Sequence, residues 1–362
     1  MIGSIKGKIM SNAASTRDIK DAYRRTSLIK SGIVVSLLFL IIFLLGFSVT
    51  LGPIQYTLWE VYSTIFHQFM PNHFASTDLA NTIVWNIRLP RALFGIIAGA
   101  SLAIGGCILQ GILKNPLASD YTLGIAHGAG FGAALAIIFG SSFIKGEYLI
   151  VANAFIFSLI PTFFIFGMSR YKRATPETLI LSGIAMMYLF SAAITLVQFF
   201  GSSDAVTAIV FWMVGDLGKA TWDKLVPMSL MMIFCIPYLI TKSFELNVMG
   251  AGDESAKSLG VNVERSRAIM MLITSLMISS VVCFTGAIGF VGLVGPHIAR
   301  MVIGGDNKFL LPAAALFGAI LLVGSDIVAT QIMAPTILPV GVVTSFLGVP
   351  LFVYLIMKRQ FE

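Results

Sequence analysis

Charged residues are scarce in this chain, and so are the groups that would indicate a soluble enzyme. Only 11% of its 362 residues are charged. A soluble globular chain carries about 25%, so this chain cannot cover a water-facing surface. The 3 cysteines lie inside apolar runs without ligand-like spacing, and no His, Cys and carboxylate residues are spaced as metal ligands. No Gly is followed at the required interval by Gly-Lys-Ser or Gly-Lys-Thr, so the chain lacks a phosphate-binding loop and cannot hydrolyse ATP alone.

Lipid is the expected main solvent, because 57% of the residues are hydrophobic. The net charge of +7 could suggest nucleic acid, but the basic residues sit in short connections between apolar runs. Basic residues there usually orient a membrane protein, so no nucleic-acid partner is expected. The first apolar run, at Ile33, lacks a small-residue cleavage site after it, which favours a retained span over a signal peptide. The expected fold class is all-α, a polytopic integral membrane helical bundle.

Ten stretches are predicted to cross the bilayer, which takes about 20 residues of apolar helix. The sixth contains Pro227 and Pro237 and the eighth has only 14 residues, so these two are the weakest. Residues 206–214 are too few to span and are predicted to dip in from one surface as a half-helix. The predicted spans are 33–51, 93–113, 121–143, 148–168, 178–200, 225–240, 268–288, 290–303, 309–333 and 338–357.

The lysines and arginines divide unevenly between the two sides of such a bundle. With the N-terminus inside, the inner segments hold 19 of the 24 Lys and Arg residues and the outer segments hold 5. By the positive-inside rule, both termini lie in the cytoplasm. We therefore expect a basic cytoplasmic tail over residues 1–30 and a single transmembrane domain over residues 31–362, in the inner (cytoplasmic) membrane of the cell.

Glycine is abundant, with 34 residues, many of them four apart inside the predicted spans. Small residues at this interval let membrane helices approach closely. The run Gly286, Gly289, Gly292 and Gly295-Pro296 interrupts a helical pattern, and backbone freed at membrane depth must be buried in protein or line water. Tight packing with broken helices is typical of transport proteins, although static packing alone would also explain the glycines.

Residues 249–260 form the one long polar stretch between the later spans on the predicted inner side. Asp253 and Glu254 suit a helix N-terminus, where unpaired N–H groups favour negative charge. Gly260 suits the left-handed position that ends a helix. The stretch is predicted to form one or two short cytoplasmic helices with Ala256 and Leu259 on an exposed face. From these residues alone, a solvated loop is the expected role.

A series of short motifs follows in order along the chain. They include Arg88-Leu89-Pro90-Arg91, Asn115-Pro116-Leu117-Ala118, Leu181-Ser182-Gly183-Ile184, Trp212-Met213-Val214-Gly215, Ser258-Leu259-Gly260-Val261, Gly286-Ala287-Ile288-Gly289-Phe290-Val291-Gly292-Leu293, Pro296-His297-Ile298-Ala299-Arg300 and Leu338-Pro339-Val340-Gly341. Each motif alone is weak, but the ordered set is specific. It resembles the FecCD-type permeases, the membrane subunits of ABC importers for iron chelates, heme and cobalamin.

The resemblance implies a fold like that of cobalamin-importer permeases and a translocation subunit without catalytic residues or a cofactor of its own. Two copies, or this chain and a related permease, would surround a central path. Two ABC ATPase subunits carrying ATP and Mg²⁺ would dock from the cytoplasm, and an extracytoplasmic binding protein would deliver the cargo. An iron(III)-siderophore is the expected cargo, with cobalamin or heme as the alternative. In such importers the loop near residues 246–264 contacts the ATPase, which assigns coupling to Gly252, Ala256, Ser258, Leu259 and Gly260.

The resemblance also assigns a docking role on the outer side. Arg88 and Arg91 would pair with acidic residues of the binding protein. Snorkelling of both cations at the membrane interface is the alternative interpretation. The chain departs from the family pattern where Thr330 stands for an arginine and Ile337 for a glutamate, so a third ionic contact is missing or replaced.

Asp326 and Gln110 are the polar residues singled out inside the spans. A charge at the bilayer centre costs about 2.5–3.5 kcal/mol, so Asp326 is expected to face a partner or water, as a structural pairing residue. An ion-coupled carrier working alone, with Asp326 as its proton or sodium site, is the alternative function. Gln110 is a candidate for the path lining. Thr175 and Pro176 are candidates for an inner gate by resemblance, although Pro176 could simply begin a helix.

Overall fold

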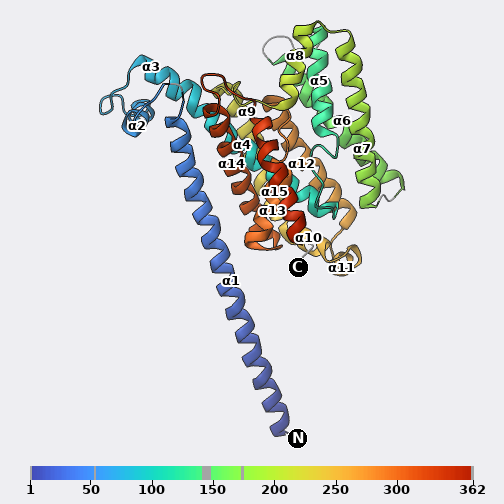
Figure 1. Ribbon diagram of the computed structural model, residues 1–362. Coiled ribbons are helices and arrows are strands. Elements are labelled where there is room, and N and C mark those ends of the chain that lie inside the picture. The colour runs from blue at the N-terminus through green and yellow to red at the C-terminus, as the bar shows by residue number, and fades with distance from the viewer. Residues whose placement is uncertain (1, 53, 141–147, 173–174, 360–362) are drawn as a thin grey trace.

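The computed structural model describes residues 2–52, 54–140, 148–172 and 175–359, and the regular elements in these ranges are all helices (Figure 1). The long helix α1 (Ile2–Thr50) stands at the edge of the molecule and extends beyond one side of the bundle. The C-terminus and two short helices, α10 and α11, lie on that side. The other elements in chain order are α2 (Leu58–His67), α3 (Asp78–Ala80), the π-helix η1 (Asn81–Arg88), α4 (Leu89–Ile112), α5 (Ile125–Phe139), α6 (Leu149–Lys172), α7 (Pro176–Phe199), α8 (Ser203–Val214), α9 (Trp222–Thr241), α10 (Ser243–Gly250), α11 (Asp253–Ser258), α12 (Val263–Thr285), α13 (Val291–Ile303), α14 (Asn307–Gln331) and α15 (Val340–Arg359).

Each of the ten predicted spans coincides with a helix. Within the described ranges, seven helical stretches are long and apolar enough to cross a membrane, in α1, α3–η1–α4, α6, α7, α9, α12 and α14. The spans in α5, α13 and α15 are shorter apolar helices, and α8 is the predicted half-helix. Helix α9 is continuous although it contains Pro227 and Pro237. Residues 141–143 of the third predicted span lie outside the described ranges, as do residue 1 of the tail and residues 360–362 of the domain.

Helix α4 is the centre of the larger group of helices. It packs against α14, α12, α13 and α9, while α5 to α8 form a second group, drawn in green in Figure 1. Glycine allows α4 its closest approaches. A methyl group on Gly99 would overlap the backbone of Gly318 in α14, and one on Gly106 would overlap the carbonyl group of Gly292 in α13. The predicted close packing at glycine is confirmed at these two crossings.

The helix that carries the Arg88 motif begins earlier than predicted. The sequence suggests that this motif opens the second span, but Asp78–Ile112 is one helical stretch and the motif lies inside it. Pro90 does not break the helix because the preceding turn, η1, is π-helical. Pro90 lacks an N–H for the Trp85 carbonyl oxygen five residues back. That oxygen accepts a hydrogen bond from Trp222 Nε1 at 3.0 Å instead, so no group is left unsatisfied.

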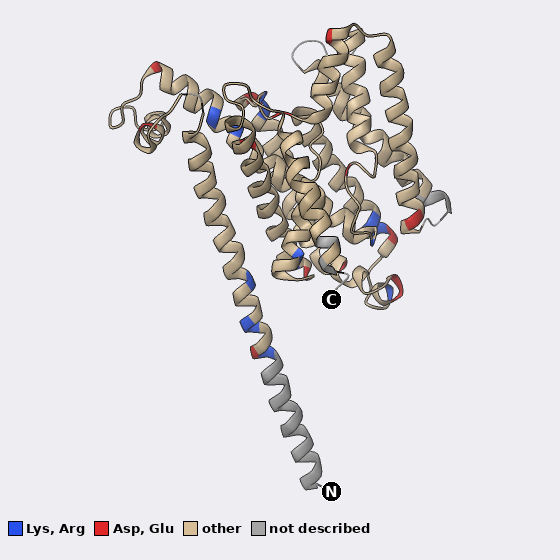
Figure 2. Cartoon of the chain, viewed as in Figure 1, with Lys and Arg blue, Asp and Glu red and all other residues tan. Residues whose placement is uncertain are grey.

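Charged side chains gather at the two ends of the bundle and on the part of α1 beyond it, as Figure 2 shows. The middle of the bundle is drawn almost entirely without Lys, Arg, Asp or Glu. Because lipid cannot solvate charge, this distribution is expected of a bundle whose helices cross a membrane. The chain is therefore a multi-pass membrane protein.

Candidate functional site

The connection between α9 and α12 forms two short helices, of which α11 is the one predicted within residues 249–260 and α10 precedes that stretch. Helix α11 begins at Asp253, and Gly260 beyond its end has φ +81°, the left-handed conformation expected from the sequence. Gly252, just before α11, has φ +129°. Only glycine adopts such conformations at little cost, so both ends of α11 are set by the sequence.

Asp253 ties this connection to two spanning helices. Its Oδ1 lies 2.8 Å from Lys114 Nζ, just past the end of α4, and its Oδ2 accepts from Arg267 Nη2, in α12, at 3.0 Å. Arg267 Nε also donates to the Ile112 carbonyl oxygen, at the end of α4, at 3.1 Å. Burial raises the pKa of Asp253, but the hydrogen bonds from Lys114 and Arg267 outweigh this and hold the pKa below its usual value. A displacement of α11 therefore acts on α4 and α12 through an ionised cluster.

Helix α10 is fastened to the start of α14. Asn247 Nδ2 donates to Asp306 Oδ1 at 2.8 Å, and Asn247 Oδ1 accepts from the backbone N–H of Asn307 at 2.8 Å. At the other end of α10, Glu245 pairs with Lys242 at 2.6 Å. The α10–α11 connection is thus bound to three spanning helices, α4, α12 and α14.

The expectation that Ala256 and Leu259 share an exposed face is wrong for Ala256. Ala256 is fully buried in the main hydrophobic core, because Asp253 holds this side of α11 against α4 and α12. The Ser258 hydroxyl donates to the Ser255 carbonyl oxygen within α11 at 2.8 Å. Leu259, at the end of α11, is 64% exposed. Leu259 and Phe244, which is 63% exposed in α10, are therefore the large apolar side chains that this connection leaves exposed.

Arg91 and Asp326 form an ion pair between α4 and α14 at the opposite end of the bundle. Arg91 Nε donates to both carboxylate oxygens at 3.0 and 3.1 Å, and Nη2 donates to Oδ1 at 2.8 Å. The two side chains are only 12% and 5% exposed. Asp326 thus has the partner that an intramembrane carboxylate requires, and Arg91 is not a free surface cation.

Arg88 holds the end of α1. Its Nη1 donates to the carbonyl oxygens of Val49 and Thr50 at 3.1 and 3.0 Å, and its Nη2 donates to that of Ile54. A cation near the C-terminal carbonyl groups of a helix is favourable. Both arginines with a predicted docking role therefore already have partners within the chain, and docking stays a prediction.

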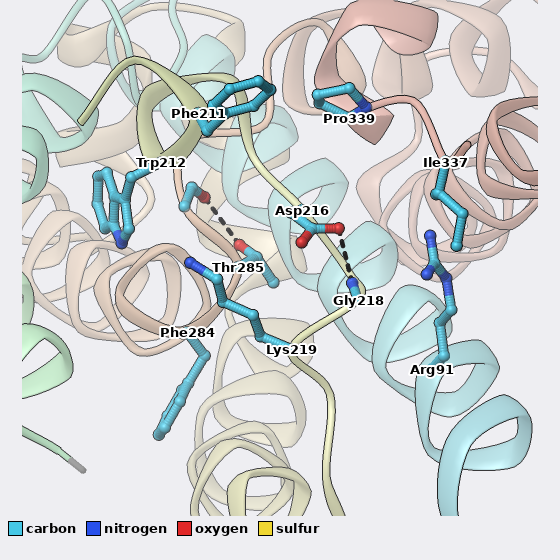
Figure 3. Close-up of a pocket in the computed structure, with 11 residues that line it drawn as sticks. Arg91, Phe211, Trp212, Asp216, Gly218, Lys219, Phe284, Thr285, Ile337 and Pro339 are labelled. Carbon is cyan, nitrogen blue, oxygen red and sulfur yellow. Dashed lines mark hydrogen bonds between the residues drawn. The ribbon is translucent and has the colours of Figure 1, made fainter. Parts of the chain in front are cut away.

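A pocket of about 270 Å³ lies beside Arg91. Figure 3 shows Ile337 next to the Arg91 guanidinium, with Asp216 and Lys219 also at the pocket. Asp216 is fixed by a backbone hydrogen bond to the Thr285 carbonyl oxygen at 2.8 Å. Of the two positions that depart from the family pattern, Ile337 lines this pocket. The other lining residues are Phe211, Trp212, Gly218, Phe284, Gly286 and Pro339.

The predicted break between the seventh and eighth spans is confirmed and lies between α12 and α13. Phe290, before α13, has φ +68°, a left-handed conformation. Gln110 is buried beside α13, where Nε2 donates to the Leu293 carbonyl oxygen and Oε1 accepts from Arg300, each at 3.4 Å. Asp120 is a buried carboxylate that sequence reasoning missed. Its Oδ2 has no hydrogen-bond partner in the described part of the chain.

Thr175 and Pro176 begin α7. The Thr175 hydroxyl accepts from the Thr178 N–H at 3.4 Å, and Pro176 takes the first helical position, where its missing N–H costs little. Helix initiation accounts for both residues, and the gating role stays a prediction. Among the described residues, no group of three or more His, Cys, Asp or Glu could hold a metal ion.

These features define a multi-pass helical membrane protein with a polar connection on one side that is fastened to its spanning helices. The chain belongs to the FecCD transport family, which matches residues 38–358. It is 48% identical to an ABC transporter permease protein of Methanocaldococcus jannaschii over 78% of this chain and 83% of that one. It is 37% identical to the hemin transport system permease protein of Yersinia pestis (90% and 94% covered). It is 36% identical to the cobalamin import system permease protein of Halobacterium salinarum (80% and 77% covered).

A solved structure shares the fold. It is described as an inward-facing conformation of a metal-chelate type ABC transporter, with TM-score 0.80 and 28% identity, covering 91% of this chain and 99% of that one. The chain is accordingly an ABC importer permease, a translocation subunit that is not itself an enzyme. Permeases of this family pair with ATPases and a binding protein. The expected fold class and family are confirmed.

Proposed function

We propose that this permease translocates an iron(III)-siderophore or a related metal chelate. The support comes from the solved structure of a metal-chelate type transporter and from the hemin permease, which resemble this chain over at least 90% of its length. Cobalamin and heme are the alternative cargoes, and cobalamin is supported by the Halobacterium relative at 36% identity. All three cargoes are metal ions enclosed by a large organic chelator.

Uptake by a deletion strain tests the cargo. Cells lacking this gene and cells carrying it on a plasmid would be given radiolabelled iron(III)-siderophore, labelled cobalamin and hemin in parallel. The proposal expects that only the labelled iron chelate requires the gene. Loss of cobalamin uptake alone, or of hemin uptake alone, would instead assign that cargo.

The ATPase subunits dock on the α10–α11 connection of a permease pair in which two copies of this chain, or this chain and a related permease, surround the path. The single observation that carries this proposal is the Asp253 cluster, since it joins an exposed connection directly to α4 and α12. Gly252 and Gly260 set the ends of α11, and Leu259 supplies the exposed apolar contact.

Substitution at Leu259 tests the docking site. A Leu259→Glu variant would place a charge in the proposed contact, whereas Leu259→Met keeps an apolar side chain of similar size and serves as the matched control. We expect the co-expressed ATPase to co-purify with the wild type and the Met variant but not with the Glu variant. Equal co-purification of the ATPase with both variants would refute the docking site.

We further propose that both termini lie in the cytoplasm and that the permease lies in the inner membrane. Residues at the outer and inner ends of the path then have proposed roles in binding-protein docking and in gating. On the outer side, a carboxylate of the binding protein would have to compete with Asp326 for Arg91, whereas Arg88 donates to backbone carbonyl groups and lies over the Tyr56 ring. An Arg88→Gln variant is therefore expected to weaken binding-protein association more directly. On the inner side, Thr175 and Pro176 would narrow the mouth at the start of α7.

An ion-coupled carrier is the second candidate, with Asp326 as its ion site. Against it stands the ion pair, because the Asp326 carboxylate is already held by three hydrogen bonds from Arg91. An Asp326→Asn variant that still imports cargo with ATP would exclude the carrier. Import by the purified chain in vesicles without an ATPase would overturn the ABC assembly.

A further inference from the structure

The connection between α1 and α4 contains a helix, α2, that the sequence analysis did not anticipate. Residues 54–80, the α2 segment, hold six Phe, Tyr or Trp residues and no Lys or Arg. Their two carboxylates are used at helix N-termini. Glu60 accepts from the Thr57 N–H at 2.7 Å in a capping box, and Asp78 lies in the first turn of α3. The α2 segment is thus almost uncharged and rich in aromatic side chains.

One side of α2 packs against α1 and η1, and another side is left open. At about 100° per residue, Leu58, Trp59, Tyr62 and Phe66 fall within an arc of about 100°. All four are exposed, Trp59 by 71%, and Phe69 in the turn after α2 is 70% exposed. A contiguous apolar patch of this kind marks an interaction surface.

The depth of α2 is fixed by its contact with α1. A methyl group built on Gly46 would lie 2.6 Å from the Tyr62 hydroxyl, so the tip of the partly exposed Tyr62 side chain reaches α1 at this glycine. Gly46 is four residues before the end of α1 at Thr50, or about 6 Å along the helix. Phe43 and Phe47, on the same stretch of α1, are exposed apolar side chains. Helix α2 therefore lies beside the spanning part of α1 rather than above its end.

Figure 1 agrees with this placement, since α2 stands beside the end of α1 and on the side away from the rest of the bundle. The polar groups of α2 that face the chain are also satisfied internally. The Ser63 hydroxyl donates to the Ala75 carbonyl oxygen, and the His67 ring nitrogen Nδ1 bonds the Phe74 carbonyl oxygen, both at 2.6 Å. A helix in a poorly hydrated surrounding needs such internal partners.

We propose that α2 is an interfacial helix, with its open apolar side inserted at the boundary between headgroups and acyl chains of the outer leaflet. Tyr and Trp are enriched at this boundary, and amphipathic helices lie about 5–10 Å into it, which matches the depth set by Gly46. A soluble binding protein is a less suitable partner for this apolar patch, because the patch contains no cation and lies level with the last turns of α1 rather than beyond its end. The anchor fixes the outer ends of α1 and α4, to which Arg88 ties the connection. The choice of the outer leaflet rests on the proposed cytoplasmic placement of both termini, whereas the anchor depends on neither the cargo nor ATP.

Spin labelling of the full chain in lipid nanodiscs tests the proposal. The three native cysteines are buried, and the unmodified protein measures any background labelling. Nitroxides would be attached in Trp59→Cys and Phe69→Cys, and power saturation would compare collisions with oxygen, which partitions into lipid, and with a water-soluble nickel chelate. We expect oxygen to be favoured several-fold at both sites.

Two control sites of similar exposure calibrate the scale. Phe43→Cys reports the lipid-facing side of α1, where Phe43 is 66% exposed, and Leu259→Cys reports the aqueous side, where Leu259 is 64% exposed. Nickel accessibility at sites 59 and 69 equal to that at site 259 would overturn the proposal in favour of a water-facing surface. Low accessibility to both reagents would overturn it in favour of a protein contact. Loss of part of the brominated-lipid quenching in Trp59→Phe, which keeps the other three tryptophans, would support insertion without any cysteine.

Discussion

The Arg91–Asp326 pair offers the sharpest test of how the end of the bundle opposite α10 and α11 is held together. Both side chains are nearly buried, 12% and 5% exposed, and three hydrogen bonds of 2.8–3.1 Å join them. Removing one partner leaves the other charge buried without a counter-ion, which costs about 3–5 kcal/mol. We therefore expect Arg91→Met and Asp326→Asn each to lower the free energy of unfolding by about that amount.

The double variant should lose less than the sum of the two single variants, because it leaves no uncompensated charge. Coupling energies between contacting residues reach about 3 kcal/mol, and hydrogen bonds to charged groups contribute about 1.5–3 kcal/mol. We expect a coupling energy of about 2–3 kcal/mol. At 1.4 kcal/mol for each factor of ten, this is roughly a 30- to 140-fold effect on the unfolding equilibrium constant.

The assay is equilibrium unfolding in mixed micelles, followed by the loss of helical circular dichroism, on the wild type, the two single variants and the double variant. The Lys257–Glu254 pair is the matched control, since its side chains are 50% and 94% exposed. Its coupling energy should stay below about 1 kcal/mol, as for other surface ion pairs. Additive losses at Arg91 and Asp326 would refute the reasoning, because they would mean that the two side chains do not meet in the folded protein.

Two further predictions concern packing and pH. Gly106→Ala should unfold the protein at lower denaturant or abolish its expression as a folded monomer, because the new methyl group overlaps the Gly292 carbonyl, whereas Gly324→Ala, with open space around it, should be neutral. The pKa of Asp253 is lowered in the folded state, so its stabilisation is present above its unfolded pKa of about 3.9 and is lost as pH falls through the folded value. The free energy of unfolding of the wild type should therefore be lower at pH 3 than at pH 7, by at most about 1 kcal/mol because the ion pair is partly exposed. This pH-dependent difference should be absent in Asp253→Asn.

Local signals explain why the helices and several of their ends are predictable. Apolar runs locate the spans because a membrane helix must satisfy its backbone internally and present apolar side chains to lipid. Pro176 and Gly260 mark helix ends through their own backbone chemistry, and both lie where the sequence places them. The polar stretch 249–260 likewise stands out by its contrast with the spans around it.

Contacts between distant segments escape the same reasoning. Arg91 and Asp326 are separated by 235 residues, and hydropathy carries no information on which helices become neighbours. The burial of Ala256 follows from how Asp253 anchors a six-residue helix, which is too short to show a periodic pattern. The sequence predicts that a helix begins near Pro90, but in the structure the helix continues through Pro90. The Trp85 carbonyl oxygen, which Pro90 cannot bond, accepts a hydrogen bond from the Trp222 side chain of another helix, and the sequence gives no sign of this contact.

The Asp253 cluster and the Arg91–Asp326 pair, at opposite ends of the bundle, both involve helix α4, so α4 can transmit a movement from one to the other. Helix α4 carries Arg91 at one end and, at the other, the Ile112 carbonyl group that Arg267 holds beside Asp253. Its middle is crossed by α14 at Gly99 and by α13 at Gly106, where the two helix backbones are in direct contact. A helix packed this closely is expected to move as a rigid unit, because bending it would disrupt the close backbone contacts at Gly99 and Gly106. A displacement of α11 is therefore expected to reach the Arg91–Asp326 pair through α4 itself. If so, weakening the Gly106 crossing should uncouple the two ends even where both ion pairs remain.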